Sequence, residues 1–187
     1  HTVVSRFNVN SLLRVYEFAK NLQPDSYVTE IAEERSELFN IGKEIEPPAE
    51  DYTKSIKELS RKVRNDFRDS DRISKITQSY RTVYYDIVSK WLKERTQIIP
   101  CYAAYASCQI TSTGDVWPCC VLGYEKPLGN LRETKYDLKT IWHSKRAEEI
   151  RAFVKKKSCS CPLANAYYTN ILCNLTQMAK TVSQTFL

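Results

Sequence analysis

The sequence predicts a mixed fold, in which an α/β unit is joined to a small α+β domain, and three observations predict it. The first forty residues alternate between strand, helix and strand patterns. Residues 46–98 are rich in charge and carry apolar residues at helical spacing. All seven cysteines lie in the C-terminal half. We therefore expect an α/β unit over 1–45, a helical bridge over 46–98 and a cysteine-rich domain over 99–187.

The N-terminal unit is predicted from three short patterns. Thr2-Val3-Val4-Ser5 has the β-branched character of a strand, the following apolar residues Leu12 and Tyr16 recur at helical spacing, and Tyr27–Ala32 is extended. A strand-helix-strand order implies parallel strands. Because parallel sheets occur almost only in larger assemblies, we expect further strands upstream. The alternative is that this unit joins the later strands in one small α+β fold.

The bridge is predicted to end in a long amphipathic helix with one buried face. An aromatic stripe at helical spacing indicates core packing rather than a binding site. The residues that define this stripe are Ile73, Ile76, Tyr80, Val83, Tyr84, Ile87 and Trp91.

The cysteine-rich part predicts a hairpin followed by a helix. The segments 107–111 and 116–119 flank Ser112-Thr113-Gly114-Asp115, a tight turn that places glycine where φ is positive. A helix is expected from Asp137 to about Lys157, and the chain then reaches Cys159-Ser160-Cys161-Pro162.

Composition and charge exclude several classes of function. The chain is 42% hydrophobic and 27% charged, which is typical of a globular protein, and no apolar run is long enough to cross a bilayer. The start lacks the layout of a signal peptide, so we expect a cytoplasmic protein without a membrane partner. The net charge of +6 is modest, and the run Lys155-Lys156-Lys157 is interpreted as a solvated helix end, so no nucleic-acid partner is expected.

An odd number of cysteines without a secretory signal indicates metal or redox chemistry rather than disulfides. Four converging thiolates suit either tetrahedral zinc or a four-iron four-sulfur cluster. Zinc ribbons usually offer two Cys-x-x-Cys pairs, and this sequence has none. No acid-base pair or nucleophile stands out, so we assign no catalytic side chain and no residue that binds an organic cofactor.

The pattern of Cys101, twelve residues, Gly114, four residues and Cys119 resembles the SPASM or twitch auxiliary-cluster domains of radical S-adenosylmethionine enzymes. The segment 114–119 looks like the hairpin of that family, Leu128-Gly129-Asn130-Leu131 like its next loop, and Ile141-Trp142-His143-Ser144 like its helix start. The N-terminal unit looks like the last strands of the family's partial (β/α) barrel.

This resemblance implies an auxiliary four-iron four-sulfur cluster in this chain, with S-adenosyl-L-methionine bound by the full-length enzyme. It also implies a peptide or small-molecule substrate and an electron donor such as a flavodoxin or ferredoxin. The Cys-x-x-x-Cys-x-x-Cys motif that holds the catalytic cluster in this family is absent. The chain is therefore expected to be the C-terminal part of such an enzyme and not to generate the radical alone.

For the cluster we predict four ligands: Cys101, Cys119, Cys159 and Cys161. The family's second half needs a Cys-x-x-Cys start, whereas Cys159 and Cys161 are one residue apart, so we expect one cluster rather than two. Cys108 is an alternative to Cys101, Cys120 is expected to be a packed thiol, and Cys173 an apolar helix residue. Two other functions remain open, namely a zinc-stabilised protein- or peptide-binding module and a thiol redox protein that uses Cys119-Cys120 or Cys159-x-Cys161.

Overall fold

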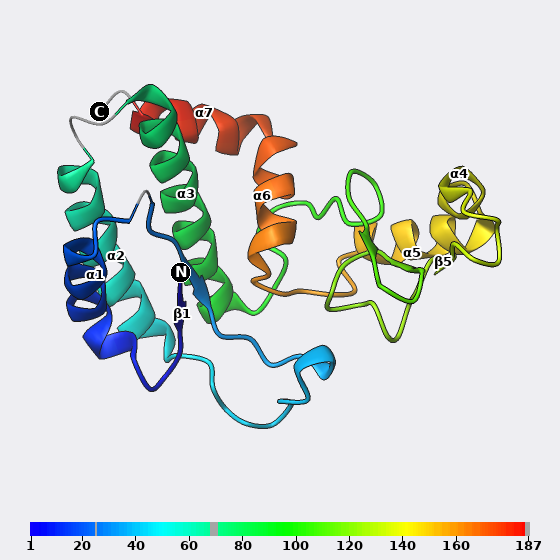
Figure 1. Ribbon diagram of the computed structural model, residues 1–187, viewed down its shortest axis with the longest axis horizontal. Coiled ribbons are helices and arrows are strands. Elements are labelled where there is room, and N and C mark those ends of the chain that lie inside the picture. Colours follow the sequence, from blue (N-terminus) through cyan, green and yellow to red (C-terminus); the bar gives the residue numbers. More distant parts are fainter. Residues whose placement is uncertain (25, 68–70, 186–187) are drawn as a thin grey trace.

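The structure, a computed structural model, describes residues 1–24, 26–67 and 71–185. A helical body with a small parallel sheet forms one end of the molecule, and a cysteine-rich part with short strands and helices forms the other end (Figure 1). Helix α6 (Ala164–Leu172) lies between the two ends. The fold is thus mixed, as predicted.

The N-terminal unit is a parallel β-α-β unit. Strand β1 pairs with β2 in parallel register, with Val4 opposite Ile31, and the side chains of both residues are buried. This confirms the predicted strand-helix-strand order. The elements are β1 (Thr2–Val4), the 3-10 turn η1 (Val9–Ser11), α1 (Leu12–Asn21), β2 (Thr29–Ile31) and the 3-10 turn η2 (Ser36–Leu38).

Two long helices follow, α2 (Ala49–Asp66) and α3 (Arg72–Glu94). The carboxylate of Asp71 caps α3 by accepting hydrogen bonds from the backbone N–H groups of Ile73 and Ser74. The second half of α3 buries the predicted face, whereas Ile73 and Ile76 in its first turns are exposed. The predicted stripe is therefore longer than the packed one, since periodicity shows which residues share a face but not how far a partner covers it.

The C-terminal helices return to the helical body. Ala164, Tyr167 and Ile171 on α6 belong to the same core as the sheet, α2 and α3, and α7 (Leu175–Thr185) packs along α3. The Tyr80 hydroxyl on α3 also donates to the backbone carbonyl of Tyr168 on α6. Helices from the predicted bridge and from the end of the chain thus share one core, and the division at 45 and 98 stays a prediction.

The cysteine-rich part has its own smaller core, built around a three-stranded antiparallel sheet. Its strands are β3 (Gln109–Ile110), β4 (Asp115–Trp117) and β5 (Gly129–Asn130), and the predicted hairpin is confirmed as β3 and β4. The prediction of one helix from Asp137 to Lys157 is wrong, because the chain forms α4 (Leu138–Trp142) and α5 (Lys145–Lys155). The Ser144 hydroxyl accepts from the N–H of Ala147 and so begins a new helix.

Among the residues that the structure describes, no helix has the length and apolar character needed to span a bilayer.

Candidate metal centre

Three separate segments supply the predicted ligands. Cys101 lies in the irregular chain after α3, Cys119 lies two residues beyond the end of β4, and Cys159 and Cys161 lie in the irregular chain between α5 and α6. All four cysteines are partly buried and unpaired. Loops and strand ends position these thiols, as is usual for functional side chains on a rigid scaffold.

The turn before Cys119 is shaped by Gly114. This residue has φ +91°, and a Cβ there would lie 3.2 Å from the side-chain oxygen of Asn130. Glycine is therefore required both for its backbone conformation and for the close approach of the next loop. Strand β5 then pairs with β4, so the hairpin and the Leu128-Gly129-Asn130 loop form one sheet next to Cys119.

The structure gathers the four predicted thiols into one neighbourhood. The thiols of Cys101 and Cys119 raise the pKa of Cys159, and they also raise the pKa of Cys161. Cys101 and Cys119 are therefore close enough to the segment 159–161 for their charges to act on it. Cys101 likewise acts on Cys119. We call Cys101, Cys119, Cys159 and Cys161 the four-thiol group.

Burial keeps most of this group protonated. Burial, together with the smaller effect of the neighbouring thiols, raises the pKa of Cys119 to about 11 and that of Cys159 to about 11. For Cys161, burial raises the pKa well above its ordinary value. Because a metal binds thiolates, loading this site must release protons from these cysteines.

Backbone N–H groups already point at two of the sulfur atoms. Cys119 is hydrogen-bonded by the backbone of Leu122 and Val121, and Cys161 by the backbone of Leu163, and these bonds favour the thiolate form. Four soft donors in a largely dehydrated setting, with N–H groups directed at sulfur, fit a thiolate-ligated metal or iron–sulfur cluster. Within residues 1–24, 26–67 and 71–185, however, no three His, Cys, Asp or Glu side chains converge to metal-binding distance.

Comparison with known families favours one kind of metal site. Residues 101–162 match SPASM, an iron-sulfur cluster-binding domain. No match was found among curated proteins or among solved structures. The SPASM match begins at the first cysteine of the four-thiol group and ends one residue after the last one, so it covers all four thiols.

The other cysteines within the SPASM segment are turned to different surroundings. The Cys120 thiol donates to the side-chain oxygen of Gln109 at 3.0 Å on the neighbouring strand. Cys108 packs against the smaller core, and burial raises its pKa. The ligand set, with Cys108 as the alternative to Cys101, stays a prediction.

Cys173 lies outside the SPASM segment, at the C-terminal cap of α6. Its side chain is exposed, and it follows the last residue of α6 rather than lying within the helix as expected. The helix ends one residue earlier, at Leu172, and the chain turns there toward α7.

Several residues around the SPASM thiols could not be found from the sequence. Tyr167 on α6 is buried, its pKa is raised by burial and by three of the thiols, and it therefore forms part of the wall of the site. Glu33 follows β2 and acts on the titration of Cys161, and burial raises the pKa of Glu33 to about 7. Glu33 lies far from the cysteines in sequence, Tyr167 follows Cys161 by six residues on α6, and neither residue belongs to a motif.

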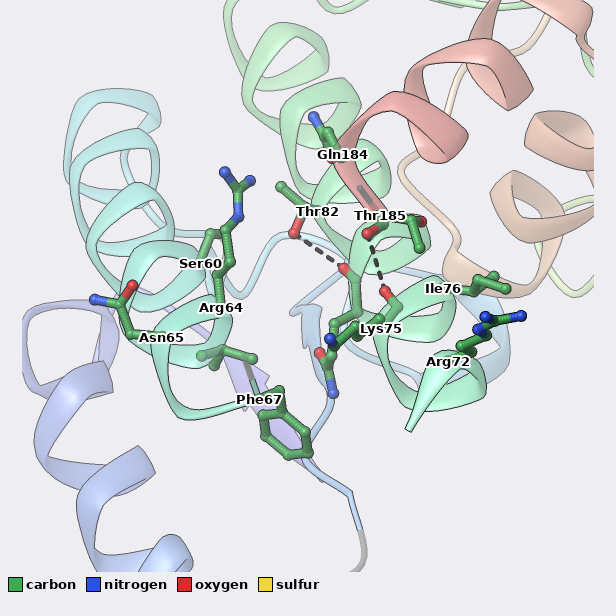
Figure 2. Close-up of a pocket in the computed structure, with 13 residues that line it drawn as sticks. Ser60, Arg64, Asn65, Phe67, Arg72, Lys75, Ile76, Thr82, Gln184 and Thr185 are labelled. Carbon is green, nitrogen blue, oxygen red and sulfur yellow. Dashed lines mark hydrogen bonds between the residues drawn. The ribbon is translucent and has the colours of Figure 1, made fainter. Parts of the chain in front are cut away.

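One cavity of the described part of the chain is separate from the SPASM thiols. It has a volume of about 810 Å³ and lies between the end of α2, the first turns of α3 and the end of α7 (Figure 2). Arg64, Arg72 and Lys75 line it, and no described lining residue is a cysteine. The candidate metal centre is thus defined by its thiols rather than by a cavity.

Proposed function

We propose that the chain holds one auxiliary four-iron four-sulfur cluster through Cys101, Cys119, Cys159 and Cys161, as the C-terminal part of a radical S-adenosylmethionine enzyme. The observation that carries this proposal is that the SPASM match over 101–162 covers four cysteines, of which Cys101 and Cys119 raise the pKa of both Cys159 and Cys161. Such a cluster supplies an electron-transfer centre or a substrate-binding iron.

The residues around the thiols have roles of their own in this proposal. The backbone N–H groups of Val121, Leu122 and Leu163 stabilise negative charge on sulfur. The body of Tyr167 and the neighbouring core keep water away from Cys161. Four cysteines would complete the ligation of one cluster, which favours electron transfer over direct substrate binding.

The N-terminal unit supports the part of the proposal that concerns a larger enzyme. Among the described residues β1 and β2 pair only with each other, in parallel. Parallel strands with a crossover helix are found almost only in larger sheets covered on both faces. We propose that these strands extend a barrel that binds S-adenosyl-L-methionine, that acts on a peptide or small-molecule substrate, and that receives electrons from a flavodoxin or ferredoxin.

Metal and sulfide analysis tests the proposal. Chain purified and reconstituted without oxygen should contain about four irons and four acid-labile sulfides, with the visible absorption of an iron–sulfur cluster. Alanine at Cys101, Cys119, Cys159 or Cys161 should lower both contents. Cys173→Ala is the matched control, because that thiol is exposed and lies outside the SPASM segment.

Two results would contradict the proposal. One zinc per chain without sulfide would favour the zinc-stabilised binding module. Full iron and sulfide content in all four ligand variants, with loss in the Cys108 or Cys120 variant, would show that the ligand set is different.

A further inference from the structure

The segment that carries Cys159 and Cys161 has no regular secondary structure of its own. Residues 158–163 form neither helix nor strand between α5 and α6. Its two cysteines are one residue apart, so their relative placement depends on the backbone conformation at Ser160. Contacts from elsewhere in the fold must therefore hold this segment.

Helix α3 supplies two such contacts. The indole Nε1 of Trp91 donates a 2.7 Å hydrogen bond to the hydroxyl oxygen of Ser160. About two turns earlier on the same helix, the Tyr84 hydroxyl donates to the backbone carbonyl of Pro162 at 3.0 Å. Both aromatic side chains are buried, with exposed fractions of 6% for Trp91 and 0% for Tyr84, so water does not compete well for these bonds.

The Trp91 ring is itself held in place. The guanidinium carbon of Arg95 lies 4.5 Å from the centre of the ring, and the same guanidinium forms a 2.6 Å ion pair with Glu46. The backbone N–H of Arg95 also closes the end of α3 on the Trp91 carbonyl. A buried indole with a cation against its ring can set the position of the hydroxyl that it bonds.

We propose that α3 is the element that positions Cys159 and Cys161, and that Trp91 is a positioning residue acting through Ser160. The role of these thiols as metal ligands rests on the proposed function. The claim that α3 positions this segment does not rest on the proposed function, because it concerns the order of the segment in the metal-free chain. Neither Trp91 nor Tyr84 lies within the SPASM match, so the family model assigns them no such role.

The test is the alkylation rate of each cysteine in the reduced, metal-free chain, measured by mass spectrometry with iodoacetamide. Loss of either bond should accelerate alkylation of Cys159 and Cys161 by about threefold to tenfold, as expected for one buried hydrogen bond. Cys101 and Cys119 should react at the native rate. The variants are Trp91→Phe, Tyr84→Phe and Ser160→Ala, with Ser160→Thr expected to restore the native rate because it retains a hydroxyl.

Two matched controls separate positioning from general loosening. Tyr80→Phe removes another hydroxyl from α3, one that bonds to α6 rather than to the cysteine segment. Trp142→Phe makes the same chemical change as Trp91→Phe, in a helix of the smaller core. Both controls should leave the rates of Cys159 and Cys161 unchanged.

A double variant sharpens the assignment. If Trp91 acts through Ser160, Trp91→Phe combined with Ser160→Ala should react no faster than the faster single variant. Additive acceleration, equal acceleration of all four thiols, or no acceleration would each overturn the proposal. Should Trp91→Phe fail to fold by circular dichroism, Ser160→Ala and Ser160→Thr carry the same test, because Ser160 is only half-buried.

Anaerobic reconstitution of the same variants distinguishes the two proposals. If the native chain takes up iron and sulfide, Trp91→Phe and Ser160→Ala should lower the content at limiting iron while the two controls match the native chain. If the native chain takes up neither, the proposed function fails, and the alkylation rates still decide whether α3 positions the segment.

Discussion

Asn130 donates a 2.8 Å hydrogen bond from its side-chain amide to a carboxylate oxygen of Asp115. The same amide also reaches the carbonyl of Thr113. The hairpin turn and the loop after it were separate motifs in the sequence, and this contact joins them into one structure. The stability of that structure is the basis of the first two predictions.

Gly114→Ala should destabilise the chain by about 1 to 3 kcal/mol, because alanine is strained at φ +91° and its Cβ would crowd Asn130. Urea unfolding measures the loss. Gly42→Ala is the matched control: Gly42 has φ +76°, but a Cβ there meets no atom within 4 Å. A loss at Gly114 no larger than at Gly42 would show that the contact with Asn130 adds nothing.

The stabilising contribution of Asp115 should be lost in acid. The hydroxyl of Thr113 and then the amide of Asn130 hold the pKa of Asp115 below its ordinary value. A carboxyl with a lowered folded-state pKa contributes stability above its unfolded pKa of about 3.9, and this contribution is lost as the pH falls through the folded value. The urea midpoint of Asp115→Asn should therefore fall less steeply than that of the native chain from about pH 5 to about pH 2. Parallel curves would contradict this.

Tyr16 joins α1 to the end of α2, since its hydroxyl donates to the Asp66 carboxylate at 2.9 Å. Tyr16→Phe should cost about 1 kcal/mol of unfolding free energy, because the buried ring stays while the hydrogen bond is lost. Lys62→Ala serves as the comparison: it removes the exposed 3.6 Å pair between Lys62 and Glu17 and a charge attraction to Asp66 but no hydrogen bond to Asp66, and it should cost less than about 0.5 kcal/mol. Equal losses in the two variants would count against a specific role of the Tyr16 hydroxyl.

Arg151 stabilises the smaller core. Its guanidinium donates to the carbonyl of Ala104 at 2.7 Å and to that of Trp142 at 2.6 Å, and it lies 4.9 Å from the centre of the Trp142 ring. Arg151→Lys should lower stability by about 2 kcal/mol, because a single ammonium cannot bridge two carbonyls and stack on a ring. Thermal unfolding would report this. Arg146→Lys, on the exposed side of the same helix, should stay within about 0.5 kcal/mol of the native chain.

The sequence by itself determined the local elements and the identity of the candidate ligands. Hydrophobic periodicity predicted the β-α-β unit and the long helix, because burial repeats at the period of each element. The spacing of Cys101, Gly114 and Cys119 predicted the hairpin and the likeness to SPASM domains that residues 101–162 show, because the turn favours glycine and the thiol follows at a fixed distance. The break at Ser144 was missed although Ser144 is a good capping residue, since the apolar pattern continues across it.

Only the tertiary structure decided what surrounds those ligands. That Trp91 bonds to Ser160, that Tyr167 borders Cys101 and that α6 joins the N-terminal core are contacts between residues separated by tens of positions. Neither periodicity nor propensity encodes such contacts, because they depend on how packed helices meet rather than on what each helix buries. The sequence alone identifies the cysteines, and the packing of helices α3 and α6 determines what surrounds them.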